Sequence, residues 1–325
     1  MQAPSQQTLR QTAKREKRPE QRKSPSIARL RRAEVPEIVY STELPWQDFA
    51  GAWSSAENTL ARLEQLLSTS ELRPFWICHS DFEEAAAVTG LAGDEVAMED
   101  LVMTDGGAEP SSPTPGWRKA RAVLALRRHI SRQGPSRVLT CEGILTLQKL
   151  MLQAGCRDAG DGLGRRAEGN GQDPIQRWLG IVEFLHSTPP LPAAALALHA
   201  WQRMAPLDRH NDEIGLLLAS TLLWHWGKTK GLSACLATGL AEGSFKPEAQ
   251  VPIGIWIRQF CEAVLLAAES GQDRHARLAR GAVRARDLLA ERRTTSRLPK
   301  LLARPWATSQ PVWSMRERAG SLIAR

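Results

Sequence analysis

Apolar residues recur at steps of three and four along most of this chain, and this period constrains the fold more than any other feature. Between residues 44 and 67 the recurring residues are Phe49, Trp53, Ala56, Leu60, Leu63, Leu66 and Leu67. Such spacing places the side chains on one stripe of an α-helix. Signals for strands are few, and tyrosine occurs once in the whole chain. The fold class is therefore predicted to be all-α.

The same periodicity predicts further helices along the chain. In the first half they are expected over residues 81–89, 98–103, 117–133 and 139–154. In the second half they are expected over residues 174–186, 191–204, 211–226, 253–269 and 275–293. The helices over 191–204 and 211–226 are the most apolar, and we expect them to form the core because a helix that is apolar all round is a buried one.

Changes in composition predict five regions. Residues 1–34 hold ten Lys or Arg against three acidic residues, so residues 1–40 are interpreted as a disordered basic arm. Residues 158–173 are rich in glycine and lack the Lys-Ser/Thr of a phosphate-binding loop, so they are interpreted as a flexible loop. The other predicted regions are an N-terminal helical region over 41–157, a helical core over 174–270 and a basic C-terminal region over 271–325.

Several classes of protein are excluded by what the sequence lacks. The five cysteines are far apart and show no C-x-x-C spacing, which argues against a zinc site and against a disulfide framework. No apolar run approaches the roughly 18 residues that span a bilayer. The basic N-terminus has no apolar core of the kind that a secretory signal needs. We therefore expect a cytoplasmic protein with no cofactor, no metal and no membrane contact.

The charge balance favours an anionic partner. The net charge is +8 and the sequence pI is about 9.6, and nucleic acid is the commonest partner of such a chain. A genome whose codon usage favours arginine explains the same excess of basic residues equally well. The location of the charge is more informative, and the C-terminal residues that we assign to DNA binding are Arg274, Arg277, Arg280, Arg284, Arg292, Arg293, Arg297 and Lys300.

Within that set, Arg277, Arg280 and Arg284 have the spacing of one helical face. A row of guanidinium groups can follow DNA phosphates. The alternative is a solvated face of a helix whose buried side consists of Leu278, Val283 and Leu288.

Residues 191–224 read LPAAALALHAWQRMAPLDRHNDEIGLLLASTLLW. This segment resembles the central helix-loop-helix of Fic-type proteins, whose pattern is His-Pro-Phe-x-Asp/Glu-Gly-Asn-Gly-Arg-x-x-Arg between two apolar helices. In Fic enzymes the histidine is the general base, the acid binds the metal, and the glycines and arginines hold nucleotide phosphates at a helix N-terminus. The resemblance implies a multi-helix Fic-like bundle.

The residues of the first half of the Fic pattern are mostly replaced. The base position is Ala205, which has no titratable group. The metal-acid position is Arg209, and the first glycine is His210. We therefore expect no catalytic residue and no metal ligand in this segment.

The second half of the pattern is altered in the same way. The second glycine is Asp212, and the two arginines are Glu213 and Leu216. Asp212 and Glu213 suit the first turn of a helix, but they repel an anionic ligand. The positions that do match are Pro206, Asn211 and the small residue Gly215. Because these are packing and turn positions, we expect a degenerate motif that keeps its fold and has lost its nucleotide site.

A second resemblance covers residues 44–305. It is to a group of uncharacterised rhizobial proteins, often plasmid-borne, that join a Fic-like helical region to a C-terminal helix-turn-helix domain for DNA binding. The segments that carry it are LPWQDFAGAWSSAENTLARLEQLL, EVAMEDLVMTDGG, residues 191–224 and TSRLPKLLARPWAT. After Pro305 only twenty residues remain, about the length of the two helices of such a domain alone. We therefore expect the helix-turn-helix region to be a truncated remnant.

Three functions stay open at this point. The first is a non-catalytic DNA-binding or transcription-regulatory protein on a Fic-like scaffold. The second is a Fic-type nucleotidyl (AMP) transferase that uses a substitute base such as His210. The third is a truncated remnant without activity. The residues predict neither the DNA sequence recognised nor a homo-oligomeric state.

Overall fold

The structure, a computed structural model, describes residues 44–107, 112–154, 173–243 and 250–290. Within these ranges the chain forms helices joined by turns and loops, with no strand. The predicted all-α class is confirmed. The basic arm predicted over 1–40, nearly all of the loop predicted over 158–173 and every residue beyond 290 lie outside the described residues.

Eleven α-helices and one 3-10 turn make up the described part of the chain. They are α1 (Trp46–Thr69), α2 (Arg73–Leu91), α3 (Met98–Asp105), α4 (Pro115–Gln133), α5 (Pro135–Val138), α6 (Cys141–Gln153), α7 (Pro174–Phe184), η2 (Leu185–Ser187), α8 (Pro190–Met204), α9 (Asn211–His225), α10 (Leu236–Glu242) and α11 (Ile253–Ala290).

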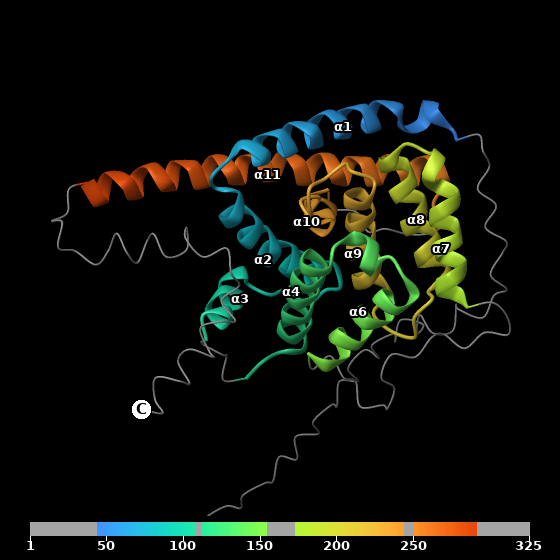
Figure 1. Ribbon diagram of the computed structural model, residues 1–325, viewed down its shortest axis with the longest axis horizontal. Helices are drawn as coiled ribbons and strands as arrows, with labels where there is room; N and C mark the ends of the chain where they lie inside the picture. Colours follow the sequence, from blue (N-terminus) through green and yellow to red (C-terminus); the bar gives the residue numbers. More distant parts are fainter. Residues whose placement is uncertain (1–43, 108–111, 155–172, 244–249, 291–325) are drawn as a thin grey trace, which may run out of the picture. The chain divides into compact units, whose positions relative to one another are not determined.

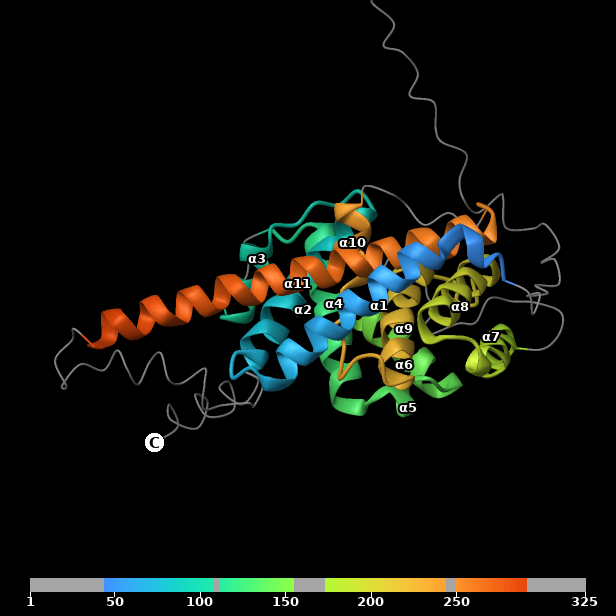
Figure 2. The same cartoon turned by 90° about the horizontal axis from the view of Figure 1, so that it is seen from above.

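Helices α1 and α11 lie along each other at one edge of the bundle (Figures 1 and 2). The predicted apolar stripe of α1 forms this contact, because its buried residues are Phe49, Ala56, Leu60, Leu63 and Leu67. On the other side of α11 lie α10, α8 and α2. Helices α8 and α9 pack together and are buried along almost their whole length, as expected from their apolar sequences.

Helix α11 is continuous where the sequence predicts two helices with a break between residues 269 and 275. Gly271, which lies within the expected break, is a point of close approach. A Cβ atom there would lie 2.9 Å from Leu63 Cδ2 and 3.0 Å from Trp76 Cζ2. The Trp76 indole also donates a hydrogen bond to the Gly271 carbonyl at 2.7 Å. The glycine is needed for packing against α1 and α2, and the helix passes through it unbroken.

A buried ion pair joins α2 to α4. Arg127 Nε donates to Asp81 Oδ1 at 2.8 Å, and Arg127 Nη2 donates to the Leu232 carbonyl at 2.8 Å. Only 1% of Arg127 is exposed. Burial acts to lower the pKa of this guanidinium, but attraction from the nearby acids, Asp81 foremost, raises it above its ordinary value. The pair therefore stays charged and holds α2, α4 and the loop before α10 together.

Helix α10, which the sequence analysis did not predict, depends on α2. Its seven residues are too few to be stable alone. The buried Glu84 carboxylate accepts hydrogen bonds from the Ala237 and Thr238 amides at 2.9 and 3.0 Å and from Thr238 Oγ1 at 2.9 Å. These amides belong to the first turn of α10, where backbone N–H groups have no hydrogen-bond partner within the helix. Glu84, on a helix distant in sequence, thus caps the first turn of α10. No pattern within the α10 sequence reveals this cap.

Candidate functional site

The turn between α8 and α9 contains the positions of the Fic pattern. Ala205 ends α8 with φ 42°, and His210 precedes α9 with φ 61°. They are the two non-glycine residues with left-handed backbone in the described part of the chain. This conformation costs roughly 1–2 kcal/mol for a residue with a Cβ. His210 stands where the Fic pattern has glycine, the residue that adopts the conformation most readily, so the turn has kept its shape although the glycine has gone.

Asn211 closes this turn from inside. Its Nδ2 donates to the Leu207 carbonyl at 2.7 Å, and its Oδ1 accepts from the Leu207 amide at 3.0 Å. The Asn211 carbonyl accepts from the Trp201 indole at 2.8 Å. Only 4% of Asn211 is exposed. All of these bonds are made within the chain, so the matching asparagine has a structural role here.

Gly215 and Pro206 are the other matching positions, and both serve packing. A Cβ at Gly215 would lie 2.6 Å from Trp201 Cδ1 and 3.3 Å from Leu198 Cδ1. This glycine allows α9 to approach α8 closely. Pro206 is buried in the turn itself. The structure therefore agrees with the interpretation that the matching residues keep the fold.

Glu213 stands where the pattern has its first arginine, and it is 9% exposed. Lys119 Nζ on α4 lies 3.4 Å from its Oε1, and His210 Nδ1 lies 3.9 Å from its Oε2. Burial acts to raise the pKa of Glu213, but the His210 and backbone hydrogen bonds and the Lys119 charge together hold it below its ordinary value. A charged carboxylate of the protein thus lies at the start of α9, where the Fic pattern places a cation for a nucleotide.

Lys119 is the residue of this site that the sequence analysis missed. It also lies 3.4 Å from Asp94 Oδ2. Burial acts to lower the pKa of Lys119, but Glu213 and Asp94 raise it above its ordinary value. In the sequence, Lys119 stands between Arg118 and Arg121 and looks like one residue of a basic helix face. A pairing across 94 positions cannot be read from a local pattern.

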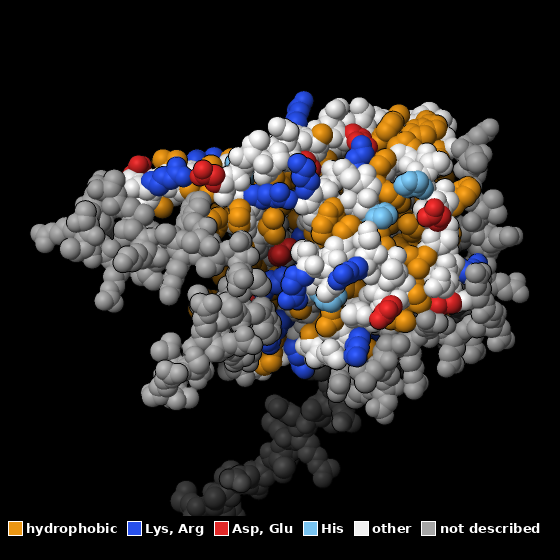
Figure 3. Space-filling view, in the orientation of Figure 1, with side chains coloured by type: hydrophobic (Ala, Val, Ile, Leu, Met, Phe, Trp, Pro, Cys, Tyr) orange, Lys and Arg blue, Asp and Glu red, His pale blue; other side chains and the backbone are white. Residues whose placement is uncertain are grey.

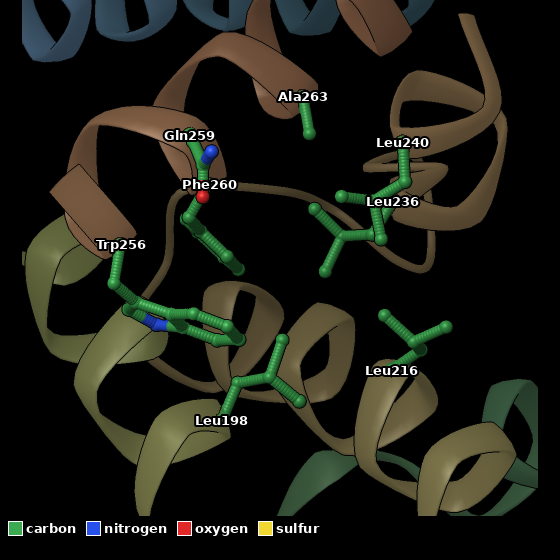
Figure 4. Close-up of a pocket in the computed structure, with 8 residues that line it drawn as sticks. All are labelled: Leu198, Leu216, Leu236, Leu240, Trp256, Gln259, Phe260 and Ala263. Carbon is green, nitrogen blue, oxygen red and sulfur yellow. The ribbon is translucent and has the colours of Figure 1, made fainter. Parts of the chain in front are cut away.

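Leu216, at the second arginine position, lines an apolar crevice (Figure 4). The other lining residues are Leu198, Leu236, Leu240, Trp256, Gln259, Phe260 and Ala263. Its interior volume is about 10 Å³, which is the space of a single water. The crevice therefore has neither the charge nor the room for a nucleotide.

The two remaining motif residues lie at the surface of the turn. Arg209 is half-buried and Asp212 is exposed. The described residues contain no group of three His, Cys, Asp or Glu side chains that could hold a metal ion. They also contain no helix that is long and apolar enough to cross a membrane.

A larger hollow of about 280 Å³ lies between α1 and the loop after α9. Its acids are already bonded within the chain. Lys228 Nζ lies 2.6 Å from Glu57 Oε2, and the Lys230 amide donates to Glu64 Oε2 at 3.0 Å. These contacts hold the loop on α1, and we assign the hollow no ligand.

Arg274 is buried, so its prediction as a DNA-binding residue is wrong. Only 1% of it is exposed. Its Nη1 donates to Ser80 Oγ at 3.0 Å, its Nη2 forms an ion pair with Glu83, and its guanidinium lies 5.4 Å from the centre of the Trp76 ring. Burial, with repulsion from Arg277, lowers its pKa to about 10. The side chain anchors α11 to α2 and cannot reach a phosphate.

The next three arginines along α11 are all exposed: Arg277, Arg280 and Arg284. They lie on the distal half of the helix, which extends past the end of α1 (Figure 1). Figure 3 shows basic side chains along this end of the molecule, with acidic ones beside them. Arg286 is also exposed, at 3.9 Å from Glu71. Arg292, Arg293, Arg297 and Lys300 lie outside the described residues.

The packing face proposed as the alternative for this helix is not buried. Val283 is 53% exposed, and Leu278 is half-buried. The side chain of Leu288 lies outside the described part of the chain. The distal half of α11 therefore presents apolar as well as basic side chains to solvent.

The described residues form an all-α bundle whose central turn is bonded internally. The structure is similar to the crystal structure of a Fic family protein from Desulfovibrio desulfuricans G20, with a TM-score of 0.57. The two share 13% sequence identity over 73% of this chain and 76% of that one. At this identity the likeness shows the fold, which confirms the Fic-like bundle predicted from residues 191–224.

Residues 168–294 match the model of a family described as "Protein of unknown function (DUF1612)". The chain is also 25% identical over 307 residues to the uncharacterized protein y4cF of Sinorhizobium fredii (strain NBRC 101917 / NGR234), which covers 74% of this chain and 80% of that protein. The predicted relation to a rhizobial protein is thereby confirmed. The helix-turn-helix region and its truncation stay predictions.

Proposed function

We propose that this chain is a non-catalytic DNA-binding or regulatory protein, in which α11 provides the DNA contact and the Fic-like bundle is the scaffold. The observation that carries the proposal is the row formed by Arg277, Arg280 and Arg284. All three are exposed on one face of a helix that extends beyond the bundle. At 1.5 Å per residue the row is about 10 Å long, which corresponds to about three phosphates of one DNA strand.

The turn between α8 and α9 supports the non-catalytic part of the proposal. Ala205 has no proton to exchange, and Glu213 places a negative charge where an anionic substrate would need a cation. General acid-base chemistry requires a titratable group within hydrogen-bond reach of the reacting atom. His210 is the nearest candidate, and its Nδ1 faces Glu213.

Acidic residues near the arginine row on α11 limit the affinity for DNA that we expect. Asp273 and Asp287 are exposed on the same helix, so the positive field is weaker than the three arginines would give alone. We therefore expect modest affinity and a strong dependence on salt. Three phosphate contacts correspond to a slope of about −3 in a plot of log affinity against log salt concentration.

Fluorescence anisotropy with a labelled duplex at two or more salt concentrations tests the DNA contact. The variant Arg277→Ala/Arg280→Ala/Arg284→Ala should lose most of the binding seen with the wild-type protein at low salt. A matched control, Arg62→Ala/Arg118→Ala/Arg177→Ala, removes the same charge from exposed positions on α1, α4 and α7 and should keep it. Equal loss in both variants, or no binding by the wild-type protein at low salt, contradicts the proposal.

Incubation with labelled ATP and a protein substrate mixture tests the absence of catalysis. We expect no transfer of AMP by the wild-type protein, and none by Ala205→His, because restoring the base leaves Glu213 at the phosphate position. Transfer that depends on His210 would favour the nucleotidyl transferase instead.

A further inference from the structure

Helix α3 presents an acidic and apolar face to solvent. Glu99 and Asp100 are exposed, and Val102 and Met103 are 43% and 61% exposed. The opposite face is fixed to the bundle because Leu101 is buried. A short helix anchored in this way keeps its outer side chains in a defined place.

A two-point ion pair adds to this anchoring. Arg128 on α4 donates from Nη1 and Nη2 to the two oxygens of Asp105, at 2.6 and 2.9 Å. Bidentate pairs of this kind fix orientation as well as distance. Asp105 is thus occupied, whereas Glu99 and Asp100 carry the outward negative charge of α3.

The distal half of α11 has the complementary character. Val283 is 53% exposed, and Arg280 and Arg284 lie on either side of it in the sequence at exposed positions. One acid, Asp287, follows them. An apolar centre with a charged rim is the usual composition of a protein interface, and the rim charges of α3 and of distal α11 are opposite.

We infer that this chain associates with a second copy of itself, with distal α11 of one copy on the outer face of α3 of the other. In this contact Val283 meets Val102 and Met103, while Arg280 and Arg284 meet Glu99 and Asp100. Within the described residues, α3 packs on α2 and α4, and α11 packs on α1, α10, α8 and α2, and the side chains of both outer faces are exposed. A two-fold arrangement forms the contact twice, as most homodimers do.

The contact uses two of the arginines that we assign to DNA. If the proposed DNA binding holds, DNA and self-association compete for the same face, and a duplex in excess dissociates the dimer. The self-association itself does not depend on the proposed function, and it is measured without DNA.

Sedimentation velocity of the full-length chain at low salt provides the test. The wild-type protein should show a concentration-dependent dimer that weakens as salt increases. Glu99→Lys/Asp100→Lys and Arg280→Glu/Arg284→Glu should each weaken it roughly tenfold or more, because like charges then meet at the contact. Met103→Ser weakens the dimer without a change of charge, and circular dichroism confirms that each variant is folded.

Mixing the two charge-reversed variants gives the sharpest result. In their heterodimer one contact joins the original acidic and basic faces, and the other joins the two reversed faces. Opposite charges meet at both contacts, so the heterodimer should form. The control Glu142→Lys/Glu183→Lys reverses two exposed acids on α6 and α7, and Glu142 lies in a first helical turn as Glu99 does. This control should dimerise normally.

A wild-type monomer at every concentration overturns the inference, as does a dimer that both reversals leave intact or a mixture that stays monomeric. Anisotropy with the α3 variant separates the two proposals. Glu99→Lys/Asp100→Lys should bind DNA at least as well as the wild-type protein, so loss of its dimer with DNA binding retained supports both.

Discussion

In the turn between α8 and α9, polar side chains form bonds within the chain, whereas on distal α11 they extend into solvent. Asn211 bonds to Leu207, and Glu213 pairs with Lys119. Arg277 and Arg280, in contrast, are exposed. The segment with the recognisable motif is therefore the one whose chemical groups are occupied. Groups able to bind a partner lie where the sequence shows no more than a charge pattern.

The same contrast occurs within one helix. Arg274 and Arg277 are less than one turn apart on α11, yet the first is buried against Trp76 and Glu83 and the second is exposed. Position on the helix decides whether an arginine stabilises the fold or is available to a partner. Four predictions, ordered by the size of their effect on stability, test this distinction.

The largest effect is expected for Arg274→Ala. Removal of the guanidinium breaks a pair with Glu83 and leaves Ser80 and Trp76 without their contact, at a cost of about 3 kcal/mol. Arg277→Ala should change the free energy of unfolding by less than about 0.5 kcal/mol. Urea denaturation of both variants measures the difference, and equal effects would mean that Arg274 is exposed in solution.

The next effect is expected for Asn211→Ala. The substitution leaves the buried amide and carbonyl of Leu207 without partners, which costs about 2 kcal/mol. The control Arg203→Ala, at an exposed position near the end of α8, should have little effect. If Asn211→Ala proves neutral in denaturant titrations, the asparagine is not what closes the turn.

Glu213→Gln should destabilise the protein in a pH-dependent manner. The pKa of Glu213 is below its ordinary value in the folded state, so its charge stabilises the fold at pH values above the unfolded pKa, about 4.5. That stability is lost as the pH falls through the folded pKa. We expect a loss of about 1–2 kcal/mol at neutral pH that disappears in acid. Thermal melts from neutral to acidic pH measure it, with the exposed Glu142→Gln as control.

The smallest effect has the opposite sign. Ala205→Gly should stabilise the protein by about 0.5 kcal/mol, because glycine adopts the left-handed conformation without the strain of a Cβ. Ala61→Gly, at an exposed position inside α1, should destabilise by about 1 kcal/mol. Destabilisation by both substitutions would show that the backbone of residue 205 is not left-handed in solution.

The sequence predicts the elements of this fold well where the apolar period is long and regular. Helices α1 and α4 lie close to where their apolar stripes place them, and α8 and α9 lie close to where their continuous apolar runs place them. The Fic-like segment also predicts that its matching residues have packing roles. These features depend on neighbours within one or two turns, and local spacing is sufficient to find them.

The sequence predicts poorly wherever a residue depends on a distant partner. The expected break at residues 270–274 is absent, because Gly271 lets α11 pass close to Leu63 and Trp76. Arg274 resembles its exposed neighbours until Ser80, 194 positions away, is found as its acceptor. Lys119 and Glu213 also form an ion pair between residues far apart in the sequence, 94 positions from each other. Charge and glycine patterns do not contain this information.

Contacts made by α2 side chains limit where the chain can be cut into fragments that fold. Glu84 starts α10, Glu83 pairs with Arg274, and Trp76 bonds to Gly271. All three partners lie in the 168–294 region that one family model covers, whereas α2 precedes it. A fragment cut at that boundary would lose the acid that caps the first turn of α10 and the α2 side chains that bury the Arg274 guanidinium. We therefore expect the two parts of the chain to fold together, so separate expression of residues 168–294 should yield an aggregating or protease-sensitive polypeptide.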